Sequence, residues 1–329
     1  TGDWFKTDFP TATGGNSGCW PDYPTLGVDE HGIYMGANMI GGCGFTIFAV
    51  DKAPLIDAVP SLGTVTAFRN LPSEGAIQPA HTYGDSPGEY FVSRRSATLI
   101  RVRRLNGPLT SPTLLELGSV TIPFHSFPPD VPALGSNTPL DSVDHRLMNA
   151  VYRDGSVLAA HSIGFDNRTA CRWYEIDAET PSLLQVGTVS DPILWYWFPG
   201  IAVNAAGSVV MGFSGSSAEQ YAAAYYTGRK PSDPEGEMAA PALLRAGDGP
   251  QNNIDGVGRN RWGDYSLTSL DPDDELALWT IQEYAHTGNR WGTWIGRLRL
   301  TIPPLAFAYD DGLPEILNPS GDTIRVTIS

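Results

Sequence analysis

The sequence has little positive charge. Lysine occurs only three times among 329 residues, and the formal net charge is −15. A protein that binds nucleic acid or an anionic membrane surface needs a basic surface to neutralise phosphates, so we expect neither partner. No apolar run approaches the roughly 20 residues that a membrane-spanning helix requires, so we also expect no membrane span.

The sequence also lacks the motifs that hold common cofactors. It contains no Cys-x-x-Cys, no His-x-x-x-His and no glycine-rich loop between a strand and a helix, so we expect no cofactor. The acidic stretch "DPDDE" at 271–275 has the carboxylates that Ca²⁺ prefers, but not the spacing of an EF-hand loop. This stretch predicts either a structural calcium site or a solvated turn.

Only three cysteines are present. Cys19 precedes one strand-like run and Cys43 follows the next, so an antiparallel pair would bring them to the same end. We expect a Cys19–Cys43 disulfide and a free Cys171; three reduced thiols are the alternative. A disulfide, high acidity and low lysine together favour a secreted or extracellular protein. The chain begins at Thr1, which indicates a processed start, and we expect a monomer within a longer multi-domain chain.

Glycine (36) and proline (27) are abundant and separate many short runs of alternating polarity. These runs form five similar units of about 45–60 residues, each with the pattern of a four-stranded antiparallel meander. The first strands of the units are expected at 22–29, 76–84, 146–154, 197–204 and 264–271. One four-stranded sheet cannot cover both of its faces, whereas radial repetition covers them, so the units predict an all-β β-propeller.

Two segments test this prediction. Residues 216–229 are rich in alanine, which favours helix, but they occupy the third-strand position of their unit and we expect a strand. The fifth unit stops one strand short. Residues 3–9 are a candidate to complete it, or they end an earlier blade of a six-bladed parent. We expect a propeller over 1–301 and a β-extension or the start of a further module over 302–329.

Two segments of the sequence resemble a known family. "DYPTLGVDEHGIYMGANM" (22–39) and "GRNRWGDYSLTSLDPDDELALWTIQEYA" (258–285) resemble the β-propeller region of large secreted bacterial proteins of mostly uncharacterised function. The resemblance implies a propeller and an extracellular setting, and it brings no known reaction. Similarity to sialidase-type propellers is only distant, because the Ser-x-Asp-x-Gly-x-x-Trp turn is absent and residues 153–162 only approach it.

The candidate site follows from the predicted fold. In a propeller the segments that lead into the innermost strands converge at the mouth of the central channel, where ligands commonly bind. The candidate ligand-binding residues are Tyr23, His145, Arg146, Trp197, Arg261 and Trp262. The candidate catalytic residues are Asp22, Asp264 and Tyr265. The alternative is that the aromatic residues pack between blades and that the aspartates cap backbone amides or pair with arginine.

Two functions fit this set of residues. The first is an extracellular binding or scaffold module whose partner is a polysaccharide or another glycan, bound by aromatic faces, carboxylates and guanidinium groups. The second is a glycoside hydrolase or polysaccharide lyase that uses Asp22 and Asp264 as acid and base, or a tyrosine nucleophile beside Arg146 and Arg261. His81 and His145 are further candidates for a base, and Glu283 is expected to make an inter-blade contact.

Overall fold

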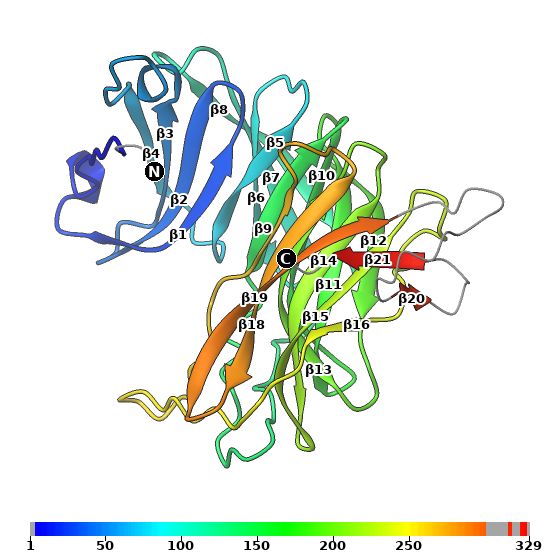
Figure 1. Cartoon of the computed structure of the whole chain (residues 1–329). Coiled ribbons are helices and arrows are strands. Elements are labelled where there is room, and N and C mark those ends of the chain that lie inside the picture. Colours follow the sequence, from blue (N-terminus) through cyan, green and yellow to red (C-terminus); the bar gives the residue numbers. More distant parts are fainter. Residues whose placement is uncertain (1–3, 301–314, 318–322, 328–329) are drawn as a thin grey trace. The chain divides into compact units, whose positions relative to one another are not determined.

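The computed structural model describes residues 4–300, 315–317 and 323–327 (Figure 1). Over these ranges the protein consists of β-strands and two single-turn 3₁₀ helices, η1 (Gly14–Asn16) and η2 (Ala53–Leu55). No helix in the described ranges is long and apolar enough to cross a membrane. The chain is all-β, as predicted.

The chain divides into two compact units, each described by itself. Unit 1 comprises Thr1–Phe124, Asn149–Ala159 and Glu175–Leu184, and unit 2 comprises His125–Met148, Ala160–Tyr174 and Gln185–Ser329. Two meanders lie in unit 1. The first contains β1 (Trp20–Val28), β2 (Gly32–Ile40), β3 (Phe45–Asp51) and β4 (Val65–Leu71), and the second contains β5 (Ile77–Tyr83), β6 (Glu89–Ser96), β7 (Leu99–Asn106) and β8 (Thr113–Thr121).

The third meander contributes residues to both units. It contains β9 (Leu147–Arg153), β10 (Ser156–Phe165), β11 (Arg168–Asp177) and β12 (Ser182–Val189). Within unit 1, Val28 of β1 pairs in parallel with His81 of β5, and Ala80 of β5 pairs in parallel with Ala150 of β9. The first strands of three consecutive meanders therefore run side by side in the same direction, as at the hub of a propeller.

Unit 2 contains the fourth meander, β13 (Trp195–Val203), β14 (Val209–Ser217), β15 (Gln220–Arg229) and β16 (Ala242–Arg245). The alanine-rich segment is the strand β15, so the strand prediction is confirmed. Ala223 and Ala224 are fully buried. Pairing with β14 and β16 on both sides outweighs the helix propensity of these alanines, which is weak compared with tertiary packing.

The last sheet, also in unit 2, has the order β17-β18-β19-β21-β20. Its strands are β17 (Leu267–Leu270), β18 (Ala277–His286), β19 (Arg290–Leu300), β20 (Glu315–Leu317) and β21 (Thr323–Thr327). β21 thus occupies the fourth position of this sheet. Residues 3–9 were the candidate strand for that position. Residues 4–9 form no strand, and the Phe9 ring packs against Phe48 at 5.5 Å between centroids.

The first strands of the last two meanders also lie together. In unit 2, Thr268 Oγ1 of β17 donates to Gly200 O of β13 at 2.7 Å, and Ser266 Oγ donates to Phe198 O at 2.7 Å. The predicted fold class, an all-β chain of four-stranded antiparallel β-propeller blades, is confirmed by this repeated arrangement. The blade total and the domain boundaries 1–301 and 302–329 stay predictions.

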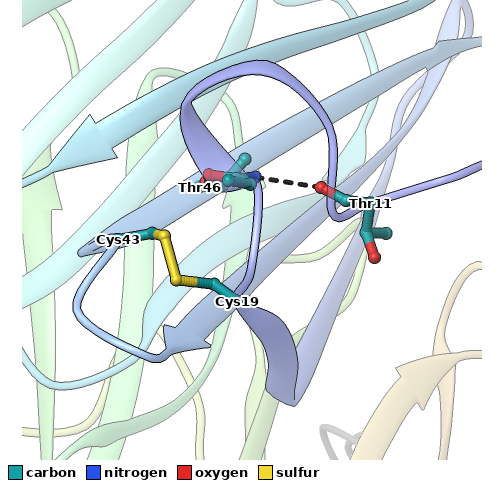
Figure 2. Close-up of a disulfide and its surroundings, with 5 residues drawn as sticks. Thr11, Cys19, Cys43 and Thr46 are labelled. Carbon is teal, nitrogen blue, oxygen red and sulfur yellow. Dashed lines mark hydrogen bonds between the residues drawn. A yellow bond between two sulfur atoms is a disulfide. The ribbon is translucent and has the colours of Figure 1, made fainter.

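The predicted disulfide between Cys19 and Cys43 is confirmed (Figure 2). It joins the residue before β1 to the loop after β2, with the two Cα atoms 6.3 Å apart. The adjacent η1 turn is held by the buried Asn16, whose Nδ2 donates to Thr11 O at 3.2 Å and whose Oδ1 accepts from Thr46 Oγ1 at 3.1 Å. Cys171 is a free, buried thiol.

Candidate functional site

Two inner strands share an irregular feature. β1 and β13 each carry a β-bulge at an aromatic–proline pair, Tyr23-Pro24 in one and Phe198-Pro199 in the other. Tyr23 has φ 49° and Phe198 has φ 53°, a left-handed conformation that is rare for bulky residues. Both side chains are buried, so the bulges fix aromatic rings inside the protein. β1 and β13 therefore share an aromatic–proline pair, a repeated signal that the list of candidate site residues did not use.

A short backbone contact in unit 2 brings together the two polar segments that lead into β9 and β17. Leu140 and Asn260 form a parallel bridge, and Asp141 N donates to Asn260 O at 2.8 Å. Through this contact, the predicted site residues Arg146 and Arg261 come into the same region of unit 2.

Ion pairs organise the charged groups of this region. Arg261 donates from one terminal nitrogen to both carboxylate oxygens of Asp264, at 3.0 and 2.9 Å. Arg146 binds Asp144 in a two-pronged contact, from Nε at 2.9 Å and from a terminal nitrogen at 2.7 Å. A second nitrogen of Arg261 lies 3.8 Å from Asp141 Oδ2, and Asp141 is buried. The result is a cluster of alternating charges with little net charge.

Glu283, on β18, adjoins this cluster. Its Oε2 accepts a hydrogen bond from Gly263 N at 2.8 Å. Burial, with a smaller contribution from the nearby Asp264 carboxylate, raises the pKa of Glu283 from 4.5 to about 7. A Cβ atom added at Gly263 would lie 2.1 Å from Glu283 Oε2, so only glycine allows this approach. The sequence indicates only an inter-blade contact for Glu283, and no motif marks it as a titrating group.

The pKa of Asp264 depends on a different balance of burial and neighbouring charges. Burial raises its pKa above the usual value, the guanidinium groups of Arg261 and Arg146 oppose that shift, and Asp141 adds to it. These opposing charges place Asp264, Arg146, Arg261 and Asp141 within electrostatic reach of one another. We call Arg146, Arg261, Asp264 and Glu283 the acid–arginine cluster.

Tyr265 follows the cluster and is the exposed aromatic residue beside it, with 56 % of its surface accessible. Trp197 and Trp262 differ from the prediction. Their rings are 0 % and 4 % exposed and lie 5.9 Å apart within an apolar core, and Trp262 Nε1 donates to Ser214 Oγ at 3.1 Å. Both side chains are buried among the apolar residues of this core, so neither ring presents a face to a ligand in this structure. Their burial fits the alternative interpretation, in which the aromatic residues pack inside the protein and do not bind a ligand.

The predicted histidines, His81 and His145, are half-buried. In unit 2, the His145 ring meets the rings of His125 and Phe127 at 5.2 and 5.3 Å between centroids, and its carbonyl lies 2.8 Å from His161 Nδ1. Burial lowers the pKa of His161 well below its usual value. In unit 1, burial likewise lowers the pKa of His81.

Asp22 and Tyr23 belong to unit 1, whereas Asp264 belongs to unit 2. Asp22 is exposed and Tyr23 is buried within β1. A joint role for Asp22 and Asp264 therefore stays a prediction.

The acidic stretch at 271–275 is occupied by protein donors. Arg297 Nε and Trp279 Nε1 both donate to Asp271 Oδ2 at 2.8 Å, and Arg297 also donates to Asp274 Oδ2 at 2.8 Å. The Arg297 hydrogen bond, with others, lowers the pKa of Asp271 to about 2. Among the described residues, no group of three or more histidine, cysteine, aspartate or glutamate side chains could hold a metal ion. This geometry favours the turn over the calcium site.

No family model and no curated protein matches the sequence. Solved structures similar to the chain include a thermostable family-43 glycoside hydrolase (11% identity, TM-score 0.41, 95% of this chain and 94% of that chain covered). They also include the GH43_1 enzyme from Xanthomonas citri (9%, 0.39, 87% and 89%) and the catalytic domain of the Coprinopsis cinerea GH62 alpha-L-arabinofuranosidase (10%, 0.40, 83% and 89%). With TM-scores below 0.5, none of these likenesses is an argument for an activity. The resemblance to secreted bacterial propeller proteins stays a prediction.

Proposed function

We propose that the protein is an extracellular carbohydrate-binding module and that the acid–arginine cluster with Tyr265 forms its binding surface. The observation that carries the proposal is the convergence of two guanidinium groups, Asp264 and Glu283 beside the exposed Tyr265 ring. A sugar offers hydroxyls, which carboxylates and guanidinium groups bind through directional hydrogen bonds. It also offers an apolar C–H face, which the phenol ring can cover.

The disulfide supports the extracellular part of this proposal. Disulfides persist in oxidising compartments and are rare where thiols are kept reduced. Cys19–Cys43 closes a hairpin of unit 1.

The test is binding to a panel of soluble neutral and uronic-acid polysaccharides by affinity electrophoresis. We expect at least one polymer to retard the wild type, and Tyr265→Ala to weaken that binding about tenfold, the usual scale for loss of a central aromatic contact. Tyr265→Phe, the matched control, keeps the ring and should retain most of the binding. A wild type that no polymer retards would refute the proposal.

One observation favours an enzymatic role instead. A carboxyl group whose pKa is about 7 carries its proton near neutral pH, as a general acid must, and Glu283 lies beside a second carboxylate, Asp264. The alternative is therefore a glycoside hydrolase or polysaccharide lyase in which Glu283 is the acid and Asp264 its negatively charged partner.

Product release from the same polysaccharides separates the two functions. An enzyme would release reducing ends or unsaturated products, and Glu283→Gln would abolish turnover while leaving polymer binding in place. A binding module would retain the polymer and release nothing. Turnover that survives in Glu283→Gln would remove Glu283 from the mechanism.

A further inference from the structure

We propose a second saccharide-binding subsite in unit 2, at the turn between β18 and β19, next to the acid–arginine cluster. A cavity of about 320 Å³ opens there, lined by Gln251, Asn253, Asn289, Arg290 and Trp291. The ligand class rests on the proposed function, and the subsite extends it from a single sugar to a chain of sugars.

The loop that forms one wall of the cavity is held in place by side-chain amides. Asn260 Nδ2 donates to Gln251 O, and Asn260 Oδ1 accepts from Asn253 N, both at 2.8 Å. From the other side, Asn289 Oδ1 accepts from Asn252 N at 2.6 Å and its Nδ2 donates to Asn252 O at 3.1 Å. The wall is therefore ordered without a ligand, which lowers the entropy cost of binding.

Gln251 is an unusual group in this wall. Its side chain is 2 % exposed, and its Oε1 accepts no hydrogen bond from the part of the chain that the structure describes. A buried amide oxygen without a donor is costly, so most such groups in proteins find a partner. Gln251 is one of the residues that line the cavity, so this unsatisfied oxygen belongs to the cavity wall.

Trp291 forms the apolar side of the same cavity. Its side chain is 61 % exposed, although indole rings are usually largely buried. An exposed ring beside amide donors and acceptors matches a pyranose, which has an apolar C–H face and hydroxyls around its rim. Arg290 adds donors only, and these would bind the carboxylate of a uronic acid.

The register of β18 and β19 connects this cavity with the cluster. Ala285 pairs with Trp291, and Glu283 pairs with Thr293. Residues two apart on a strand point to the same face, so Glu283 and Trp291 share one face as diagonal neighbours. One oligosaccharide chain can therefore contact both, and affinity should increase with chain length.

The experiment compares Trp291→Ala with the wild type in affinity electrophoresis on arabinoxylan, mixed-linkage β-glucan, galactan and polygalacturonate. We expect Trp291→Ala to bind at least about tenfold more weakly to the polymer that retards the wild type, and Trp291→Phe to retain most of the affinity. Trp20→Ala removes a similarly exposed tryptophan (56 %) in unit 1 and should leave polymer binding unchanged. Because residue 291 is exposed, the variants should keep the wild-type thermal midpoint.

Tyr265→Ala, measured alongside, separates failure of the subsite from failure of the proposed function. Binding lost in Tyr265→Ala but unchanged in Trp291→Ala overturns the subsite and leaves the cluster. Binding lost in Trp291→Ala alone supports the cavity and overturns the cluster as the binding surface. No retardation of the wild type by any polymer overturns both. Retention on polygalacturonate alone, lost in Arg290→Gln, would identify the ligand as a uronic acid chain.

Discussion

Glu283→Gln should change the pH dependence of stability in a way that the structure specifies. Glutamine keeps the size of the side chain and an oxygen that can accept the Gly263 N–H, but it cannot ionise. In the wild type, burial holds the pKa of Glu283 at about 7, compared with 4.5 for an unperturbed carboxyl. The folded protein therefore binds this proton more tightly than the unfolded chain does.

The sign and the size follow from that difference in pKa. Between pH 4.5 and 7 the folded state holds more protons than the unfolded state, so the free energy of unfolding of the wild type falls as pH rises. Each pKa unit is worth about 1.4 kcal/mol, so the loss is about 3 kcal/mol and is complete above pH 7. Glu283→Gln lacks this loss. The free energy of unfolding of the variant should therefore equal that of the wild type near pH 4 and exceed it by about 3 kcal/mol at pH 8.

Urea unfolding, followed by tryptophan fluorescence at a series of pH values, measures this difference. Glu235→Gln makes the same substitution at an exposed position in the same unit and is the matched control. A Glu283→Gln difference that stays constant from pH 4 to 8 would show that Glu283 ionises normally. Glu283 would then not be a group with a raised pKa beside Asp264.

Three further changes test other parts of the structure. Cys19→Ser opens a loop with a sequence separation of 24 and should lower the free energy of unfolding by about 3 kcal/mol, measured against the wild type with and without reductant. The pKa of Asp271 is lowered to about 2, mainly by Arg297, so its stabilising contribution is present above about pH 4 and lost as pH falls towards 2. Thermal midpoints of the wild type should fall over that interval more than those of Asp271→Asn. Trp262→Ala removes a buried ring and should cost about 3–5 kcal/mol in urea unfolding, whereas a small effect would mean that the ring is not in the core.

The strands were predictable because their signals are local. Alternating polarity and turn residues mark β1 and β2, and the cysteines that flank this hairpin meet because an antiparallel pair returns to its starting end. The Ala223–Ala224 region shows where local propensity alone fails. There, the repeat position indicated a strand, and pairing on both sides of β15 supplied the reason.

The candidate site was predictable only in part. Arg146, Arg261 and Asp264 were found because they lead into inner strands, and the structure brings them together in unit 2. Trp197 and Trp262 also precede or begin inner strands but are buried in one apolar core, because their burial depends on packing between distant segments that no local pattern shows.

The sequence by itself determined the all-β class, the repeated meanders, the disulfide and the acidic character, because each depends on neighbouring residues or on composition. Only the tertiary structure decided which side chains are buried and which carboxyl group has its pKa raised towards neutral pH. Desolvation of Glu283, like the cavity beside Trp291, arises from segments far apart in the chain. The strength of this desolvation depends on how closely residues of different segments surround the Glu283 carboxyl group, which no local sequence pattern contains.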